Sequence, residues 1–283
     1  MKQNIFDTAL ITGADGMIGS YVDFGLRTNH RSLDVTDLKE VLAVCKQHKP
    51  KLIVHLAAET DLDRCERDIE RAYMVNAVGT YNMATAAREV GAKLVYVSTS
   101  GIFDGKKQKP YSEEDIPRPQ SQYGHSKYLG EIAAKELCND ALIVRIAWVF
   151  GGGPTKDQKF VAKIIRQLQE PIINVVKEKY GSPTYGKDLI TGIKRLVVEE
   201  RSGIYHMGNE GAATRADVVR EIVRLMNSKA EIREVDASFL NLPQGEEGFH
   251  NESMISKVAY MRPWREALKE YIQTEWQNGR QSS

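Results

Sequence analysis

Short apolar runs alternate with longer amphipathic segments through the first half of the chain. Turn residues bound the runs, which read TALIT (8–12), KLIVHLAA (51–58), KLVYVSTS (93–100) and ALIVRIAWVF (141–150). Strands buried on both faces are continuously apolar, and the spacing between these runs leaves room for a helix. Right-handed crossovers then wind helices onto both faces of one sheet. The pattern therefore predicts a doubly wound, Rossmann-like parallel α/β sheet.

The segments after the second and fourth runs complete this expectation. Residues 68–91 keep a helical period and end at a glycine, which predicts one long crossover helix with its C-terminal cap. After Phe150 the strand–helix rhythm weakens. We expect a Rossmann domain of residues 1–150 with about 171–206. A smaller substrate-binding lobe of about 151–170 and 207–283 would close over the carboxyl ends of the strands, where such sheets bind ligands.

Composition and charge exclude several classes of function. The chain of 283 residues has 39 basic and 38 acidic side chains, so its net charge of +1 creates no field that attracts nucleic acid. Three isolated cysteines and six histidines without an i, i+4 pair predict neither a disulfide framework nor a metal site. The longest apolar run holds Arg145 and is too short to span a membrane. We expect a soluble cytoplasmic protein.

A glycine-rich turn follows the first apolar run. The sequence GADGMIG places Gly13, Gly16 and Gly19 at three-residue spacing, with Met17 and Ile18 between the last two, where the predicted strand turns into a helix. Glycines allow a pyrophosphate to approach the backbone amides at a helix N-terminus. The turn predicts a dinucleotide site; the alternative is a tight turn that binds nothing.

The end of the second strand bears on the choice of dinucleotide. An NAD site usually has a carboxylate there for the ribose hydroxyls. In the segment LRTNHRSLDVTD, Arg27, His30 and Arg31 come before the first carboxylate, Asp34. A 2′-phosphate would meet positive charge, so we predict NADP. NAD stays open, because strand-end arginines are often only solvated.

The stretch SQYGHSKYLGE holds a tyrosine and a lysine one helical turn apart, Tyr123 and Lys127. A phenol has a pKa near ~10 and needs a nearby cation to act in proton transfer at neutral pH. An ammonium four residues along a helix lies on the same face and can supply that charge. The hydroxyl cluster Ser98, Thr99 and Ser100 ends the third apolar run, at the edge of the sheet where this helix should also present its pair.

The order and spacing of these motifs carry a resemblance to a known family. With the glycine loop, HLAA, VNAVGT, STSGIFDG, YGHSK and RIAWVFG in this order, the chain resembles the extended short-chain dehydrogenase/reductases. Through FDG, WVFG, YGSPTYGKDL and PWREALKEYI it is similar to the dTDP-4-dehydrorhamnose reductase family. The resemblance implies hydride transfer from NAD(P)H to the 4-keto group of a nucleotide-linked 6-deoxy sugar. It implies Tyr123 as proton donor, Lys127 as its activator and Thr99 as hydroxyl partner, and it implies that Tyr123 and Lys127 also contact the cofactor.

The same resemblance assigns further positions. It implies that Asp34 and Val35 bracket the adenine of the cofactor and that Ala57 and Ala58 are the small residues beside it. It also implies that Asn76 is the helix asparagine that supports the strand on the cofactor side. It implies substrate contacts for Ser100 and Trp148, and for Thr184 beside Pro183. The alternatives are strand-end packing for the alanines, a core position between the lobes for Trp148, and a simple turn for the GSPT loop. A homodimer is compatible with the family.

Two departures from the family leave the sugar open. The family's S-T-D-Y-V-F reads STSGIF here, so Ser100 and Gly101 replace an aspartate and a tyrosine, and EGFHNESMISKV replaces a conserved C-terminal motif. Dehydration is disfavoured, because it needs an acid and a base directly after the threonine. An epimerase of the same fold, or a non-catalytic regulatory protein of this fold, remains an alternative.

Overall fold

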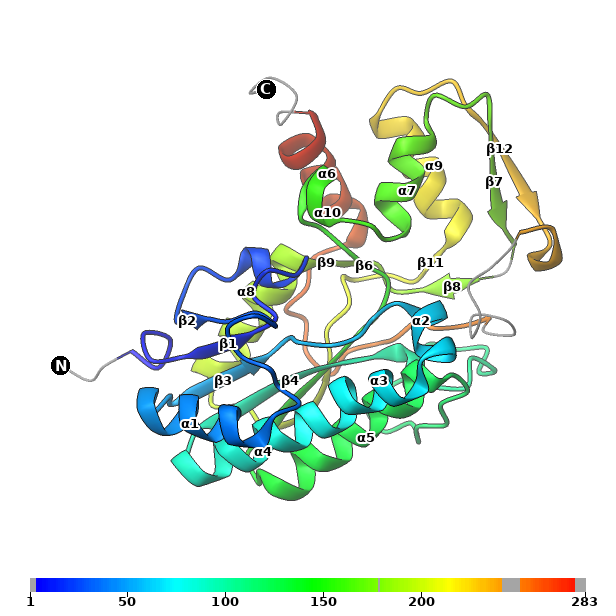
Figure 1. The fold of residues 1–283 in the computed structure, drawn as a ribbon. Helices are drawn as coiled ribbons and strands as arrows, with labels where there is room; N and C mark the ends of the chain where they lie inside the picture. Colours follow the sequence, from blue (N-terminus) through cyan, green and yellow to red (C-terminus); the bar gives the residue numbers. More distant parts are fainter. Residues whose placement is uncertain (1–3, 178, 241–249, 278–283) are drawn as a thin grey trace.

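The computed structural model describes residues 4–177, 179–240 and 250–277, and it contains a six-stranded parallel sheet (Figure 1). The strand order is β10-β5-β4-β3-β1-β2. The bounds are β1 Leu10–Thr12, β2 Leu26–Arg27, β3 Leu52–His55, β4 Lys93–Thr99, β5 Leu142–Ile146 and β10 Gly203–His206. Strands β1, β3 and β5 are buried along their whole length, as the continuous apolar runs require. The predicted fold class is confirmed.

Helices cover both faces of this sheet, and each face has its own hydrophobic core (Figure 1). One face packs against α1 (Leu38–His48), α4 (Gly79–Val90) and α5 (Gln122–Leu137). The other face packs against α8 (Gly186–Val198), whose buried leucines and isoleucines meet side chains of β1, β3, β4 and β5. None of the helices in the described part of the chain has the length and apolarity that a bilayer crossing requires.

Two helical predictions need correction. The glycine turn leads only into a three-residue 3-10 turn, Gly19–Tyr21, and no longer helix follows it. The segment 68–91 is helical, but it divides into α3 (Ile69–Tyr73), a π-helical turn (Met74–Val78) and α4. It ends at Gly91 in the left-handed conformation, as the sequence indicates. A short helix, α2 (Leu62–Arg67), precedes it.

The remaining elements form a smaller lobe with its own core (Figure 1). They are β6 Val149–Phe150, α6 Gly153–Lys156, α7 Phe160–Gln167, β7 Ile172–Val176, β8 Tyr180–Gly181, β9 Thr184–Tyr185, β11 Ala213–Thr214, α9 Arg215–Leu225, β12 Glu231–Val235, a 3-10 turn Ala237–Phe239, α10 Trp264–Tyr271 and a π-helical turn Ile272–Gln277. Strand β7 pairs with β12, and Ile173 and Val175 belong to this core. We propose the two-part division predicted above, with β6, β7, β8 and β9 moved from the larger to the smaller part.

Helix α5 packs tightly against β4 and its neighbouring turns at two residues that have no side chain. A Cβ atom at Gly130 would overlap the Tyr96 hydroxyl and lie 2.8 Å from the Asn76 carbonyl oxygen. A Cβ atom at Gly124 would overlap the carbonyl oxygen of Gly101. The glycines therefore set the distance between the helix that carries Tyr123 and Lys127 and the strand that ends at Thr99.

Gly130→Ala should lower the free energy of unfolding by about 2 kcal/mol, because the new methyl group meets a buried ring and a backbone carbonyl. Helix propensity alone predicts the opposite sign, a gain of up to about 1 kcal/mol. Urea unfolding followed by circular dichroism measures the difference.

Gly192→Ala on α8 is the matched control, since its Cβ atom meets chiefly the flexible end of Met207. We expect this variant to change stability by less than about 1 kcal/mol in either direction. Equal effects of the two substitutions would contradict the close approach of α5 and β4.

Candidate active site

The glycine turn packs directly on the end of β3. Gly13 has a φ of +67°, and a Cβ atom there would lie 2.7 Å from the backbone nitrogen of Ala57. The Ala57 amide donates to Thr12 Oγ1 over 3.2 Å. The turn and the predicted alanine pair therefore form one surface at the carboxyl edge of the sheet.

Two backbone amides of this turn are available to a ligand. Among the described residues, the amides of Met17 and Ile18 donate no hydrogen bond, whereas the Gly16 amide closes the turn onto Gly13. Unpaired amides at a glycine-rich turn form an anion site. The turn thus fits the pyrophosphate of a dinucleotide.

A buried histidine links β1, β3 and α4 beneath this surface. His55 Nδ1 lies 2.7 Å from Thr12 Oγ1, and its Nε2 lies 3.2 Å from Thr80 Oγ1. Burial lowers the pKa of His55 to about 3, and the charge of Lys127 adds to this effect. The ring is therefore neutral at physiological pH, and it holds the strands in place.

Asn76, in the π-helical turn, supports the segment after β3. Its Oδ1 accepts a hydrogen bond from the Glu59 amide over 2.9 Å, and its Nδ2 donates to the Glu59 carbonyl oxygen and to Ser126 Oγ. Asn76 itself is fully buried. It connects the segment after Ala57 and Ala58 to α5, which agrees with the predicted supporting role.

The end of β2 agrees only in part with the prediction that its arginines meet a 2′-phosphate. The guanidinium of Arg27 donates to the backbone carbonyls of Ala14 and Val22, so this arginine holds the glycine turn. Arg31 is exposed just beyond the strand. Asp34 accepts hydrogen bonds from Thr36, and Val35 is buried against Gly79.

The structure brings Thr99, Tyr123 and Lys127 together at the end of β4. The ammonium of Lys127 donates to the Val97 carbonyl oxygen over 2.8 Å and lies 4.3 Å from the centre of the Tyr96 ring. Lys127 is only 3% exposed. A hydrogen bond with Thr99 favours the ionised form of Tyr123.

Burial shifts the pKa values of Lys127 and Tyr123. Burial lowers the pKa of Lys127 to about 7, and the carboxylate of Glu131, one turn further along α5, opposes the shift. Burial raises the pKa of Tyr123 to about 12, while its hydrogen bond with Thr99 opposes the shift. At neutral pH the phenol is therefore protonated, which is the form that a proton donor requires.

A buried ion pair holds α5 against β5 behind this trio. Arg145 donates to both carboxylate oxygens of Glu131, with the shortest contact at 2.8 Å. Arg145 also lies 5.4 Å from the centre of the Phe103 ring. Because Glu131 follows Lys127 by four residues, the pair fixes the turn of α5 that carries the ammonium.

Trp148 stands at the junction of the two lobes, directly after β5. Its backbone is left-handed, with a φ of +41°, and its half-buried indole lies under the guanidinium of Arg215 at 4.0 Å. A Cβ atom at Gly181 would overlap the indole, so β8 supports its other side. Trp148 is neither a core residue nor freely exposed.

Two predicted substrate residues are buried. Thr184 is fully buried and donates to the Ala147 carbonyl oxygen over 2.6 Å. Its hydroxyl is therefore engaged by the backbone just after β5, and its direct contact with substrate stays a prediction. Ser100 is 3% exposed and begins a 3-10 turn that Thr99 caps.

Residues that local sequence patterns did not indicate also line this region. Lys156 Nζ donates to the Asp15 carbonyl oxygen, and Lys159 Nζ donates to the Thr60 carbonyl oxygen, each over 3.0 Å. Both lysines belong to the smaller lobe and reach over loops of the dinucleotide side. Glu252 accepts a hydrogen bond from the Trp148 indole. Contacts this distant in sequence leave no local signal.

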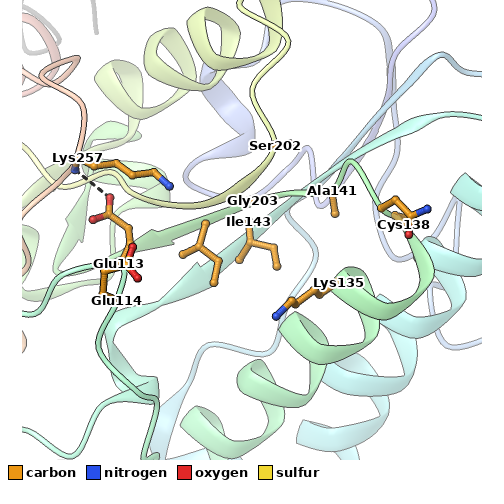
Figure 2. A pocket seen from close by; sticks show the side chains of 11 residues that line it. Glu113, Glu114, Lys135, Cys138, Ala141, Ile143, Ser202, Gly203 and Lys257 are labelled. Atoms are coloured by element: carbon orange, nitrogen blue, oxygen red, sulfur yellow. Dashed lines mark hydrogen bonds between the residues drawn. The ribbon is translucent and has the colours of Figure 1, made fainter.

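A separate cavity of about 360 Å³ lies away from the trio, beside β5 and β10 (Figure 2). Lys135 and Cys138 of α5 line one end, and Glu113 and Lys257 line the other. Glu113 accepts hydrogen bonds from the backbone amides of His206 and Lys257. None of the predicted catalytic or cofactor residues lines this cavity.

The parallel sheet, the glycine turn and the threonine–tyrosine–lysine trio define an oxidoreductase of the extended short-chain dehydrogenase/reductase type. A family model described as the RmlD substrate binding domain matches residues 7–276, and the chain belongs to this family. The resemblance predicted from the motifs is confirmed.

Three similar proteins place the chain more narrowly. The spore coat polysaccharide biosynthesis protein SpsK of Bacillus subtilis is 31% identical, over 93% of this chain and 96% of that protein. A dTDP-4-dehydrorhamnose reductase of Streptomyces griseus is 33% identical, over 92% of this chain and 91% of that protein. The crystal structure of a dTDP-4-dehydrorhamnose reductase of Bacillus anthracis in complex with NADP is 32% identical, with a TM-score of 0.86, and the match covers 94% of this chain and 98% of that one.

Lys127→Met should raise stability most at low pH. The unfolded chain keeps a lysine pKa near 10.5, whereas that of folded Lys127 is about 7. Below pH 7, folding buries the charged Lys127 ammonium, which lowers the free energy of unfolding. Between pH 7 and 10.5, folding releases the proton of this lysine, so the loss of stability shrinks as the pH rises. Above pH 10.5 the loss is absent. After allowance for the lost bond to Val97, we expect a gain of about 1–3 kcal/mol at pH 6 that fades toward pH 10.

Urea unfolding at a series of pH values measures this gain. Lys135→Met, at an exposed position of the same helix, should show no comparable pH dependence. A Lys127→Met variant that is less stable than the parent at every pH would refute the assigned burial cost.

Proposed function

We propose that this protein reduces the 4-keto group of a nucleotide-linked 6-deoxy sugar with NADPH, in the supply of precursors for polysaccharides. The observation that carries the proposal is the trio of Thr99, Tyr123 and Lys127 at the carboxyl end of β4, beside the glycine turn. Reductases with this substrate name and a polysaccharide biosynthesis protein are among the similar proteins.

The chemistry follows from the positions of the three side chains. When bound, the dihydronicotinamide supplies a hydride to the carbonyl carbon. Negative charge then develops on the sugar oxygen, where Thr99 donates a hydrogen bond and Tyr123 donates its proton. Lys127 lies one turn away and stabilises the phenolate that remains.

The cofactor side of the cleft supports this assignment. The free amides of Met17 and Ile18 would hold the pyrophosphate, and Ala57 and Ala58 leave space beside it. We propose NADP as the preferred form, because exposed Arg31 lies at the ribose end while Asp34 is engaged with Thr36. The similar reductase of Bacillus anthracis was crystallised with NADP.

We propose that Trp148 lines the substrate side. Its indole packs against Arg215 and Gly181 but stays half-buried, and the part left uncovered would contact the deoxy-sugar. We propose a cytoplasmic location, since the three cysteines are all free and buried, as a reducing compartment allows.

Tyr123→Phe should lower kcat for sugar reduction by about 10²–10⁴-fold, because it removes the proton donor and leaves the cofactor surface intact. NADPH oxidation, compared with NADH oxidation, across a panel of nucleotide-linked 4-keto-6-deoxy sugars measures the loss. The dissociation constant for NADPH should change by less than about twofold.

Tyr81→Phe, at an exposed tyrosine of α4, is the control and should keep full activity. Unchanged turnover in Tyr123→Phe would remove the assigned role. Absence of turnover in the parent protein across the whole panel would favour the non-catalytic alternative.

We also propose that the protein forms a homodimer through the outer face of its paired helices. Exposed apolar side chains gather there on α3, α4, α5 and the π-helical turn: Ile69, Met74, Val78, Tyr81, Leu129 and Ile132. Helices α4 and α5, which carry three of these side chains, lie side by side (Figure 1). A second copy related by a twofold axis would cover the same apolar surface on both subunits.

Leu129→Glu should convert the dimer to a monomer, because it places a charge in the centre of this apolar face. Light scattering after size exclusion measures the mass. Glu266→Gln, at an exposed position on α10, should leave the dimer intact. A parent protein that stays monomeric at high concentration would disprove the interface.

A further inference from the structure

The segment around Glu252 is firmly attached to the wall of the cleft. The buried side chain of Asn251 donates to the carbonyl oxygens of Lys107 and Lys109, over 2.7 and 3.1 Å. The hydroxyl of buried Ser253 donates to Asn251 Oδ1 over 2.6 Å. The Glu252 amide donates to the Tyr180 carbonyl oxygen over 2.8 Å. The backbone on both sides of Glu252 is therefore fixed between β8 and the loop that follows Thr99.

The Glu252 carboxylate lies between the two halves of the site. Its Oε2 atom accepts a hydrogen bond from the Trp148 indole over 2.6 Å. Its charge also raises the pKa of Tyr123, after burial and the charge of Cys65, so the carboxylate lies within electrostatic reach of the phenol. One acidic side chain thus bonds the proposed sugar platform and acts electrostatically on the proposed proton donor.

The Trp148 indole depends on this contact for its position. The left-handed backbone of Trp148 costs about 1–3 kcal/mol, and such strain persists only where surrounding contacts impose it. Arg215 covers one face of the ring and Gly181 lies against it, but Glu252 is the hydrogen-bond partner that fixes its edge. Charge-assisted bonds of this kind are stronger than neutral ones.

The strand end near Tyr123 offers little to orient a sugar. Gly101 has no side chain, and a Cβ atom there would lie 3.6 Å from the Tyr123 ring. Ser100 is buried. A polar contact for a sugar hydroxyl can come instead from Glu252 of the C-terminal segment, which bonds the Trp148 indole.

We propose that Glu252 is a specificity-determining residue for the reaction proposed above. Its carboxylate accepts a hydrogen bond from the sugar hydroxyl on carbon 3, next to the ketone, while it holds Trp148 against the ring. A carboxylate has room for both bonds, since its two oxygens offer about four acceptor sites. The preferred substrate class is a 4-keto-6-deoxy sugar nucleotide that keeps its 3-hydroxyl, over 3,6-dideoxy analogues.

The test compares Glu252→Gln with the parent protein on two substrates, a nucleotide-linked 4-keto-6-deoxy sugar and its 3-deoxy analogue. The amide oxygen of glutamine can still accept the indole hydrogen bond, so Trp148 keeps its partner. We expect kcat/KM to fall about 10–100-fold for the hydroxylated sugar and less than about threefold for the analogue. The KM for NADPH should not change.

Glu252→Asp should recover part of the loss, because it restores the charge. Glu266→Gln on α10 is the matched control and should behave as the parent. Equal losses on both substrates, or no loss on either, would overturn the proposal.

The inference rests on the proposed reduction, but binding tests it separately. Calorimetric titration of both sugar nucleotides into the parent and Glu252→Gln requires no turnover. Affinity that falls only for the hydroxylated sugar supports the role of Glu252, even in a protein that turns over neither sugar. Equal affinities in the two proteins overturn it, whereas absent turnover with intact discrimination overturns only the proposed reduction.

Discussion

The close approach of α5 to β4 is the constraint on which the rest of the site depends. Gly124 and Gly130 remove the side chains that would separate the helix from the strand. The helix can therefore insert the Lys127 ammonium under the Val97 carbonyl and bring Tyr123 to the end of β4. A side chain at Gly124 or Gly130 would push the helix outward and move Tyr123 and Lys127 away from Thr99.

Burying charge at this contact makes the site reactive and costs stability. Among the described residues, the close partners of the Lys127 ammonium are the Val97 carbonyl oxygen and the Tyr96 ring. Behind it, Arg145 and Glu131 form a buried ion pair. Such a pair adds little to stability, but it fixes the orientation of the α5 turn that carries Lys127. The protein holds these charges in place through the hydrophobic cores on both faces of the sheet.

The sequence predicts the parts of the molecule that local periodicity and short spacing encode. Continuous apolar runs predict the parallel strands, and the four-residue spacing of Tyr123 and Lys127 predicts their common helical face. The missing helix after Gly19 and the burial of Thr184 depend instead on tertiary packing. Glu252 and Trp148 are 104 residues apart, so no local pattern in either segment predicts their contact. The pairing of β7 with β12 is hidden for the same reason.

The attachment of the Glu252 segment has a consequence for how such a protein can diversify. Its anchors are the 105–111 loop and β8, and α5 contributes none of the described hydrogen bonds that hold it. Under the roles proposed above, substitutions there can alter which sugar is accepted while the helix that carries Tyr123 and Lys127 stays undisturbed. Selection can therefore act on substrate choice and on catalytic power almost independently, and a single scaffold can give rise to enzymes for many deoxysugars.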